Sequence, residues 1–290
     1  MVKAYVSLTK PRIIELLLIT TIPAMFLAAG GVPPWRLVLW TMLGGWLAAA
    51  SANTFNCVWD ADIDEVMRRT RRRAVPRAQV GTASATAFGV VLAVLATLVL
   101  GFGANWLSAL LALAANAFYV FIYTIWLKRR TWQNIIWGGI AGCFPPLIGW
   151  TAVTNQVALA PFVLFAIVFF WTPPHTWTLG FRYRDDYAAA GVPMLPVVRS
   201  APFVARQIVV YSVATVVTSL LVWPTAQTGW VYPAVAAIAG AVFLWEAAQL
   251  LRRANAGLEG AQLRAMRLFH FSNTYLALIF IAMAVDPVIF

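Results

Sequence analysis

The sequence predicts an all-α, polytopic membrane protein with nine transmembrane helices and a cytoplasmic N-terminus. Of its 290 residues, 62% are hydrophobic and only 11% are charged, whereas soluble domains have about 45–50% and about 25%. The apolar residues gather in runs of roughly twenty, the length that a helix needs to cross about 30 Å of hydrocarbon. With only two cysteines, these observations exclude a soluble, disordered, collagen-like or disulfide-rich protein.

Apolar runs that end at Gly, Pro or charged residues define the spans in order. The first follows a basic lead without a small-residue cleavage site, so we expect a retained helix rather than a signal peptide. The second and the sixth each end in an acidic segment, and a Pro-Pro pair is expected to break the sixth. The nine predicted spans cover about residues 12–30, 36–58, 83–101, 105–126, 134–153, 160–180, 204–223, 230–250 and 270–286. No linker divides the chain, so residues 1–290 are expected to form one domain.

The positions of the basic residues predict the orientation. Lys and Arg number 21, and with nine spans all of them except Arg36 fall on the side of the N-terminus. Short cytoplasmic loops retain positive charge, so this side is expected to be cytoplasmic in a multi-pass protein of the cell membrane. The net charge of +11 is then explained by topology and by attraction to anionic membrane lipids. No nucleic-acid module is present, and no nucleic-acid partner is predicted.

The first acidic segment, NCVWDADIDEV, ends the second span. On a helix Asn56, Asp60 and Asp64 are spaced i, i+4 and i+8 and therefore share one face. Carboxylates beside an amide suit Mg²⁺, a hard cation that keeps several waters and bridges to phosphate oxygens. Two alternatives stay open at this point. The acids are either solvated helix-end groups paired with the following arginines, or part of an ion pathway in a transporter.

The second acidic segment, FRYRDDYAAAGVPMLP, contains Asp185 and Asp186. Because adjacent helical residues are about 100° apart, only one of the two is expected to point at a shared ion. Lys128 and Arg129 end the fourth span, and Arg69 follows the first acidic segment; each alone is equally well explained as the basic end of a span. Acids for Mg²⁺ and basic groups for phosphate oxygens on one membrane face together predict a diphosphate site at the mouth of an apolar cavity.

The remaining candidate is His175, which follows the Pro-Pro pair of the sixth span. It is either a buried histidine satisfied by a neighbour or a ligand for the metal of a substrate. Cys57 and Cys143 belong to no metal-binding or haem-attachment motif.

These residues carry a resemblance to a known family. NCVWDADID resembles the first aspartate-rich motif of the intramembrane aromatic polyprenyltransferases, and RYRDDYAAAGVPMLP resembles the second. TKPR, MRRTRRR, YTIWLKRRT, GGIAGCFPPLIGW and WTPPHTW follow the order of that family between residues 9 and 177. WTPPH with DDYAAAGVPM is typical of its haem-farnesylating branch, the protohaem IX farnesyltransferases or haem O synthases. The second motif departs from other prenyltransferases at Phe181, where they carry an acid.

The resemblance implies a nine-helix fold around a central cavity whose polar mouth is cytoplasmic. It implies transfer of a farnesyl group from farnesyl diphosphate to a vinyl group of haem B, with addition of water, to give haem O. Haem B is then a substrate, Mg²⁺ the cofactor, and a haem A synthase or a terminal oxidase under assembly the candidate protein partner.

The resemblance also assigns roles to residues. The catalytic group comprises Asn56, Asp60, Asp64, Asp185 and Asp186. Of these, Asp60, Asp64 and Asp185 are expected to hold the metal. The expected diphosphate contacts are Arg12, Arg69, Lys128 and Arg129. His175 is expected to bind haem. The alternatives are a carrier for an anionic or haem-like ligand, and prenylation of a different aromatic acceptor.

Overall fold

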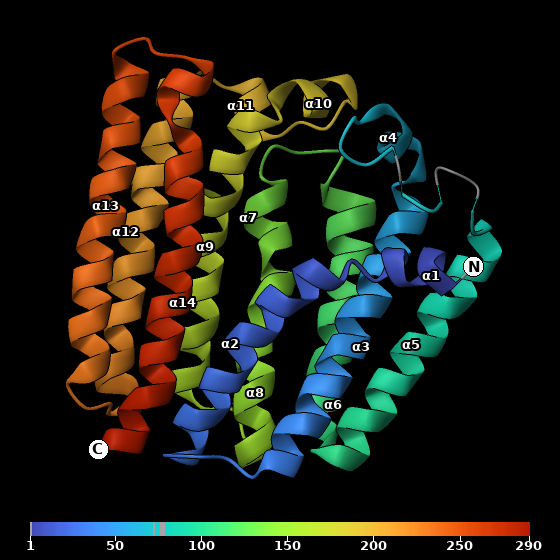
Figure 1. Ribbon diagram of the computed structural model, residues 1–290, viewed down its shortest axis with the longest axis vertical. Coiled ribbons are helices and arrows are strands. Elements are labelled where there is room, and N and C mark those ends of the chain that lie inside the picture. Colours follow the sequence, from blue (N-terminus) through green and yellow to red (C-terminus); the bar gives the residue numbers. More distant parts are fainter. Residues whose placement is uncertain (1, 72, 76–78) are drawn as a thin grey trace.

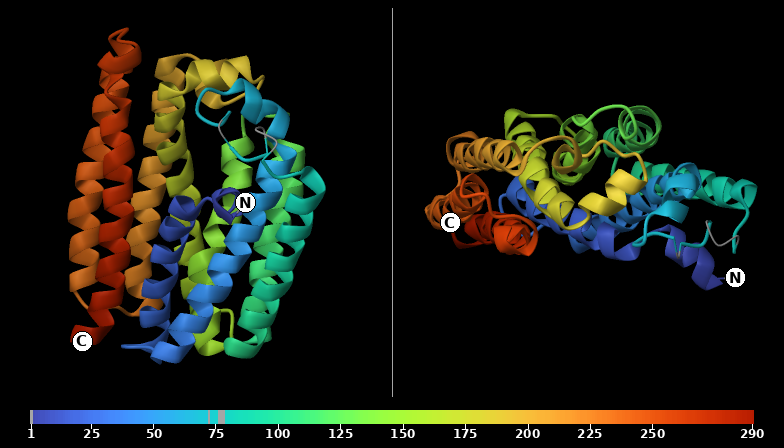
Figure 2. Two further views of the ribbon diagram at one scale, coloured as in Figure 1. Left: turned by 45° about the vertical axis from the view of Figure 1, so that its right-hand side comes forward. Right: turned by 90° about the horizontal axis from the view of Figure 1, so that it is seen from above.

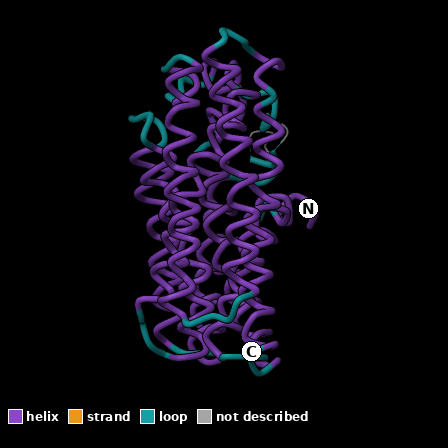
Figure 3. The backbone as a smooth tube through the Cα atoms, turned by 90° about the vertical axis from the view of Figure 1, so that its left-hand side faces the viewer, coloured by secondary structure: helices purple, strands orange, loops and turns teal. Residues whose placement is uncertain are grey.

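The protein, described by a computed structural model, consists of helices and the loops that join them (Figures 1 and 3). Residues 2–71, 73–75 and 79–290 are described, without the side chains of residues 12–18. Within this part of the chain, seven helical segments are long and apolar enough to cross a membrane, which confirms an all-α polytopic membrane protein. They are α5 (Thr82–Gly103), α6 with η1 (Trp106–Leu127), α7 to α8 (Asn134–Thr154), α9 (Leu159–Arg182), α12 (Ala201–Ala226), α13 (Val231–Asn255) and α14 (Ala265–Ile289).

The first two predicted spans correspond to α2 (Pro11–Ala29) and α3 (Trp35–Trp59), which are outside this set of seven. The second half of α3 buries several polar side chains, among them Ser51, Asn53 and Thr54. Polar groups at this depth are costly in lipid and usually face the interior of a bundle. The second half of α3 therefore faces the interior of the bundle.

The helices form one bundle in which the first long helix meets the last. α2 packs against both α8 (Phe144–Thr154) and α14, α3 packs against α5, and α9 packs against α12. Figure 2 shows the bundle from two further directions. The main apolar core lies among α9, α12, α13 and α14, where large aromatic side chains such as Trp177 and Phe243 are fully buried.

Both acidic segments lie at one end of the bundle. The first forms α4 (Ala61–Val66), and the second forms α10 (Arg184–Ala189), which is followed by α11 (Leu195–Val198). These three short helices lie at the same end in Figure 1, opposite the C-terminus. The two acidic segments therefore lie at the same end of the bundle, as predicted.

Two of the spans are irregular close to this end. α6 (Trp106–Ala117) continues as the π-helix η1 (Phe118–Leu127), which ends with a hydrogen bond from the Lys128 amide to the Tyr123 carbonyl at 2.9 Å. The next span divides into α7 (Asn134–Gly138), the 3₁₀ turn η2 (Gly139–Cys143) and α8. A Cβ atom at Gly138 would lie 2.1 Å from the Tyr123 ring, so glycine permits the close contact of these two segments. π-Helical turns are frequent at functional sites.

The predicted break of the sixth span is wrong. α9 continues as an α-helix through Pro173 and Pro174, both of which are buried. A proline removes one backbone hydrogen bond and crowds the preceding turn, but neighbouring helices compensate for this loss in a bundle. Packing against α12 and α14 provides that support here.

Candidate functional site

A buried polar cluster lies where α3 ends. Asn56, Asp60 and Asp64 are exposed by only 3%, 0% and 1%. The Asn56 amide nitrogen donates to Asp60 Oδ2 at 2.7 Å and to Thr124 Oγ1 of η1 at 3.2 Å. The Asp64 amide donates to the Asp60 carbonyl at 2.8 Å, so the chain turns into α4 with helical spacing. The three predicted site residues are thus buried together at one helix end.

Each of these three side chains receives a cation from a different segment. Lys128 Nζ, at the end of η1, donates to Asp60 Oδ2. Arg73 Nη1 donates to Asp64 Oδ2 at 2.5 Å, and Lys10 Nζ donates to Asn56 Oδ1 at 2.5 Å. Buried ion pairs are costly to form and strongly destabilising to break, so this arrangement is sensitive to the loss of either partner.

The chain that precedes Lys10 is anchored on α3. α1 (Val2–Leu8) packs on α3, and the Asn53 amide nitrogen donates to the Thr9 carbonyl at 3.0 Å. Lys10 itself has a left-handed backbone with φ of 50°, which is uncommon and costly for a residue with a side chain. Burial lowers the pKa of Lys10 to about 8, and the positive charges of Arg73 and Lys128 act in the same direction. Backbone strain and desolvation therefore both oppose the placement of the Lys10 ammonium group beside Asn56.

Arg129 contacts both the buried Asp60 and the exposed Asp62. Its guanidinium donates to the two carboxylate oxygens of Asp62 at 2.6 and 2.7 Å, and it lies 3.8 Å from Asp60 Oδ1. The Asp62 side chain is 64% exposed, as its helical position away from Asp60 predicts. The hydrogen bond from Arg129 lowers the pKa of Asp62. Arg129 thus lies at the boundary between the buried cluster and solvent.

The cluster has the chemical character of a magnesium site. Asp60 Oδ1 is buried and has no hydrogen-bond partner, so it is free to accept a further ligand. The oxygens of Asn56, Asp60 and Asp64 are the hard donors that Mg²⁺ prefers. These residues therefore fit the ion. The described residues contain no group of three or more His, Cys, Asp or Glu side chains arranged for a metal, so the structure does not add Asp185 to Asp60 and Asp64.

Asp185 and Asp186 instead lie on α10. Asp185 is exposed and lines a polar cavity of about 560 Å³ together with Arg182, Arg199 and Glu259, while Asp186 is half-buried. The guanidinium carbon of Arg69 lies 5.5 Å from the centre of the Tyr183 ring, two residues before Asp185. Arg69 therefore contacts the second acidic segment.

The side chain of Arg12, the remaining predicted diphosphate contact, lies outside the described residues.

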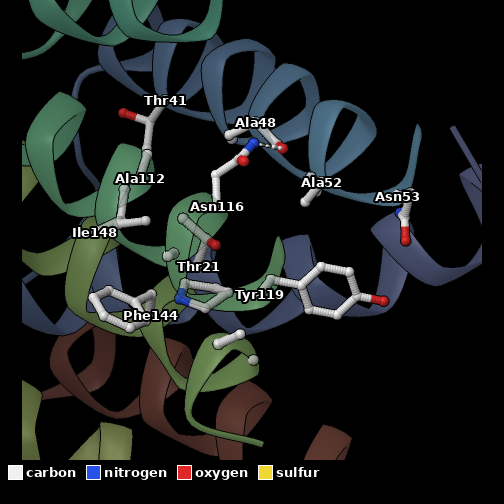
Figure 4. Close-up of a pocket in the computed structure, with 16 residues that line it drawn as sticks. Thr21, Thr41, Ala48, Ala52, Asn53, Ala112, Asn116, Tyr119, Phe144 and Ile148 are labelled. Carbon is white, nitrogen blue, oxygen red and sulfur yellow. Dashed lines mark hydrogen bonds between the residues drawn. The ribbon is translucent and has the colours of Figure 1, made fainter. Parts of the chain in front are cut away.

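An apolar cavity of about 190 Å³ lies within the bundle, and its wall on α3 includes Asn53, one turn before Asn56 of the polar cluster. α3 contributes residues 41, 45, 48, 49, 52 and 53, a spacing that places them on one helix face. Asn56 and Asp60 continue that face by one and two further turns. Figure 4 shows Asn53 and Tyr119 together on one side of the cavity, and Phe144 and Ile148 on the other. The lined stretch of α3 is about 18 Å long at 1.5 Å per residue.

The lining of this cavity consists mostly of small or apolar residues. Eight of its sixteen lining residues are Ala or Gly. The Asn116 amide nitrogen, which would otherwise be polar in this wall, donates to the Ala48 carbonyl at 3.1 Å. The space is therefore suited to an unbranched or lightly branched hydrocarbon chain.

His175 lies apart from this cluster, between α9 and α14. Its ring is stacked between Trp171, at a centroid distance of 4.3 Å, and Phe269, at 4.5 Å. Its Nδ1 lies 2.8 Å from Ser272 Oγ. Nδ1 is satisfied by a neighbour, whereas Nε2 makes no hydrogen bond to any described residue. Both interpretations of His175, as a satisfied buried histidine and as a metal ligand, therefore stay open.

Several residues of these sites were not predicted from the sequence. Lys10 and Arg73 lie within the motifs TKPR and MRRTRRR, which offered a signal. Asn53, Thr124 and Ser272 are ordinary polar residues of apolar helices, and only the packing of distant segments shows their partners.

Comparison with known proteins places this fold and site in a family. Residues 17–273 match the model of the UbiA prenyltransferase family. A protein of Cutibacterium acnes named protoheme IX farnesyltransferase is 69% identical over 288 residues, which cover 99% of this chain and 86% of that protein. A protein of the same name from Nocardioides sp. is 59% identical over 286 residues, with 99% and 91% covered.

Solved structures of the family share the fold at low sequence identity. Digeranylgeranylglyceryl phosphate synthase superposes with a TM-score of 0.81 at 18% identity, covering 100% of this chain and 99% of its own. A UbiA homologue from Archaeoglobus fulgidus, bound to GPP and Mg²⁺, gives 0.68 at 15% identity, covering 99% and 100%. The family match over most of the chain and the full-length relatives show that this chain belongs to the UbiA prenyltransferase family.

Proposed function

We propose that this protein transfers the farnesyl group of farnesyl diphosphate to a vinyl group of haem B, with addition of water, and so produces haem O and diphosphate. The observation that carries the proposal is the face of α3, which lines an apolar cavity and continues into a buried cluster of carboxylates and cations. A prenyl diphosphate has the same division into a hydrocarbon chain and a charged head. The relatives that share 59–69% of the sequence are named for this reaction.

The diphosphate is placed at the polar end of that face. Lys128 and Lys10 supply buried positive charge, and Arg129 supplies a planar guanidinium at the edge that matches two phosphate oxygens. Arg12 and Arg69 are proposed as further contacts, and Asp185 with Asp186 as groups of α10 that approach the diphosphate when substrate binds. The proposed diphosphate site is thus formed by three segments that are distant in the sequence, namely α4, η1 and the TKPR segment, and together they would orient the substrate.

Asn56, Asp60 and Asp64 would hold Mg²⁺, with Asp185 as a further ligand. The bound ion supplies positive charge that stabilises the leaving diphosphate. Asp60 is suited to this role because its Oδ1 accepts no hydrogen bond from the described residues. A UbiA homologue has been solved with GPP and Mg²⁺, which supports the same pairing of ion and substrate here.

The protein residues then promote ionisation and guide the new bond. The C1–O bond of farnesyl diphosphate breaks, and its electron pair leaves with the diphosphate, which the cationic groups stabilise. The vinyl π-electrons of haem B form the new C–C bond to the allylic carbon. Water adds to the resulting carbocation and loses a proton, leaving the hydroxyl. The apolar cavity and the Tyr119 ring exclude water from the first cation and stabilise its charge.

His175 is proposed to bind the haem substrate. Its ring is fixed on both faces by aromatic side chains, and Nε2 makes no hydrogen bond within the described part of the chain. A fixed imidazole with one available nitrogen is a common ligand for haem iron.

The proposed molecule is a single domain of residues 1–290 with nine membrane spans, in which α2 and α3 join the seven apolar helices. Its N-terminus and the mouth of the site face the cytoplasm of the cell membrane. This orientation is supported by the distribution of basic residues. They lie at the end of the bundle where α4, α10 and the α13–α14 loop are found, whereas Arg36 lies at the start of α3. The haem O formed would pass to a terminal oxidase, or to a haem A synthase.

The test is to incubate the purified protein in nanodiscs with haem B, farnesyl diphosphate and Mg²⁺ and to determine the mass of the extracted haems. A Mg²⁺-dependent hydroxyethylfarnesyl haem is expected. Prenylation of other aromatic acceptors, with haem B unchanged, would overturn the acceptor. Binding of haem without release of diphosphate from any substrate pair would overturn the enzyme in favour of a carrier.

A further inference from the structure

Ser272 joins α14 to the candidate haem ligand on α9. Its side-chain oxygen lies 2.8 Å from His175 Nδ1, and its carbonyl accepts a hydrogen bond from Trp171 Nε1 at 2.8 Å. Trp171 and His175 are one turn apart on α9, and Phe269 and Ser272 are one turn apart on α14. Trp171 and Phe269 each place a ring against one face of the imidazole, and Ser272 contacts its Nδ1 edge.

The hydrogen bonds of Ser272 determine which histidine nitrogen carries the proton. The Ser272 hydroxyl donates to the Phe269 carbonyl at 2.7 Å, and a carbonyl can only accept. A hydroxyl has one proton, so towards His175 the same oxygen accepts. Nδ1 must then be the protonated nitrogen, and Nε2 must carry the lone pair.

We propose that Ser272 is a positioning residue that holds His175 in the Nδ1-protonated tautomer, so that the Nε2 lone pair is presented to the haem substrate. This inference rests on the proposed haem-binding role of His175. Histidines that bind metals usually donate their other N–H to a protein acceptor, which fixes the tautomer and strengthens the ligand. The stacked rings of Trp171 and Phe269 hold the plane of the imidazole, and Ser272 holds its rotation within that plane.

The experiment measures ferrous haem B binding to the protein in nanodiscs, from the position of the Soret band and the dissociation constant. S272A is expected to weaken binding by on the order of tenfold and to shift the Soret band, because loss of the acceptor typically costs 10–100-fold. S272T keeps the hydroxyl and is expected to retain the spectrum. T274A is the matched control. Thr274 also bonds a carbonyl one turn back on α14, at 3.3 Å to His270, and T274A is expected to leave binding unchanged.

A double-mutant cycle separates positioning from a general effect on folding. In H175A, which itself is expected to lose the band shift, the additional S272A change should have no further effect on haem affinity. An equal loss from S272A in both backgrounds would overturn the proposal, as would an unchanged wild-type spectrum in S272A. The cycle uses only variants that keep the wild-type thermal transition; if H175A fails this criterion, H175Q takes its place.

Farnesyl transfer is measured on the same samples, so that two failures can be told apart. S272A is expected to raise KM for haem B and to leave KM for farnesyl diphosphate unchanged. If the wild-type protein forms no farnesylated haem, the proposed function fails whatever the spectra show. If it forms the product while H175A binds haem with an unaltered spectrum, only the roles of His175 and Ser272 fail.

Discussion

At the scale of single residues, the site is a set of buried charges that depend on one another. Asp60 is wholly buried and accepts hydrogen bonds from Asn56 and Lys128, while its Oδ1 accepts none from the described residues. Asp62, two residues on, is exposed and forms an ion pair with Arg129 at the edge. Two acids in one short segment are thus expected to differ greatly in importance, because only one is withdrawn from water.

Replacing Asp60 with Asn tests this difference. D60N keeps the size of the side chain but removes the charge that would hold Mg²⁺, so we expect haem O formation to fall by about 100- to 1,000-fold. The control is D62N, which we expect to retain nearly full activity. Product mass after timed incubation provides the measurement, and full activity of D60N would contradict the assignment.

The Lys128–Asp60 pair predicts a second effect, on stability. K128M removes the hydrogen-bonded cation of the buried Asp60 carboxylate and leaves it only the more distant guanidinium of Arg129, 3.8 Å away, which is expected to cost about 3–5 kcal/mol. D60N/K128M leaves neither charge, so its thermal transition in detergent is expected to return towards that of the wild-type protein while activity stays lost. A double variant that is less stable than K128M would show that the pair is not coupled in this way.

At the scale of elements, α3 connects the two parts of the site. The α3 residues that line the cavity share one face with Asn56 and with Asp60 at the end of the helix, because they recur at three- and four-residue steps. The π-helix η1 and the segment before α2 supply the cations that meet this face. In the proposed site, we therefore expect α3 to set the position of the diphosphate relative to its hydrocarbon chain.

Enlarging a small residue of this face is expected to change the preferred chain length. A48L places a larger side chain in the cavity, so we expect the preference to move from farnesyl towards geranyl diphosphate by about tenfold or more in kcat/KM, since one to three kcal/mol are typical for such pockets. The control is A237L on the exposed side of α13. The test compares the two substrates in competition, and an unchanged preference in A48L would place the chain elsewhere.

At the scale of the whole molecule, the distribution of charge separates the two ends of the bundle. α4, α10 and the α13–α14 loop lie together at the end that carries the basic residues, and the C-terminus lies at the other end (Figure 1). The long helices between them cross the apolar region as one bundle in which α2 closes against α14. The charge distribution therefore predicts which end meets the cytoplasm.

Two glutamines at opposite ends allow a matched test of this topology. Q262C, in the exposed turn η3 (Gly260–Leu263), is expected to react with an impermeant thiol reagent only from the cytoplasmic side. Q156C, in the exposed loop between α8 and α9, is expected to react from the outer side. Both native cysteines are buried, so the unsubstituted protein is expected to give little signal. The opposite labelling pattern would reverse the proposed orientation.

Hydropathy and helical spacing alone were sufficient for the long apolar helices, for the polar face of Asn56, Asp60 and Asp64, and for the clustering of acids and bases at one end. These features depend on local sequence, since the period of a helix places residues on faces wherever the helix packs. The pairing of Asp64 with Arg73, nine residues on, agrees with the expected pairing of acids with the arginines that follow, whereas the pairing of Asp60 with Lys128 and of His175 with Ser272 depends on how segments 68 and 97 residues apart pack together. The continuity of α9 through its two prolines has the same origin. Packing also decided the volume of the cavity, because a lining exists only where several helices meet, and no single helix carries that information.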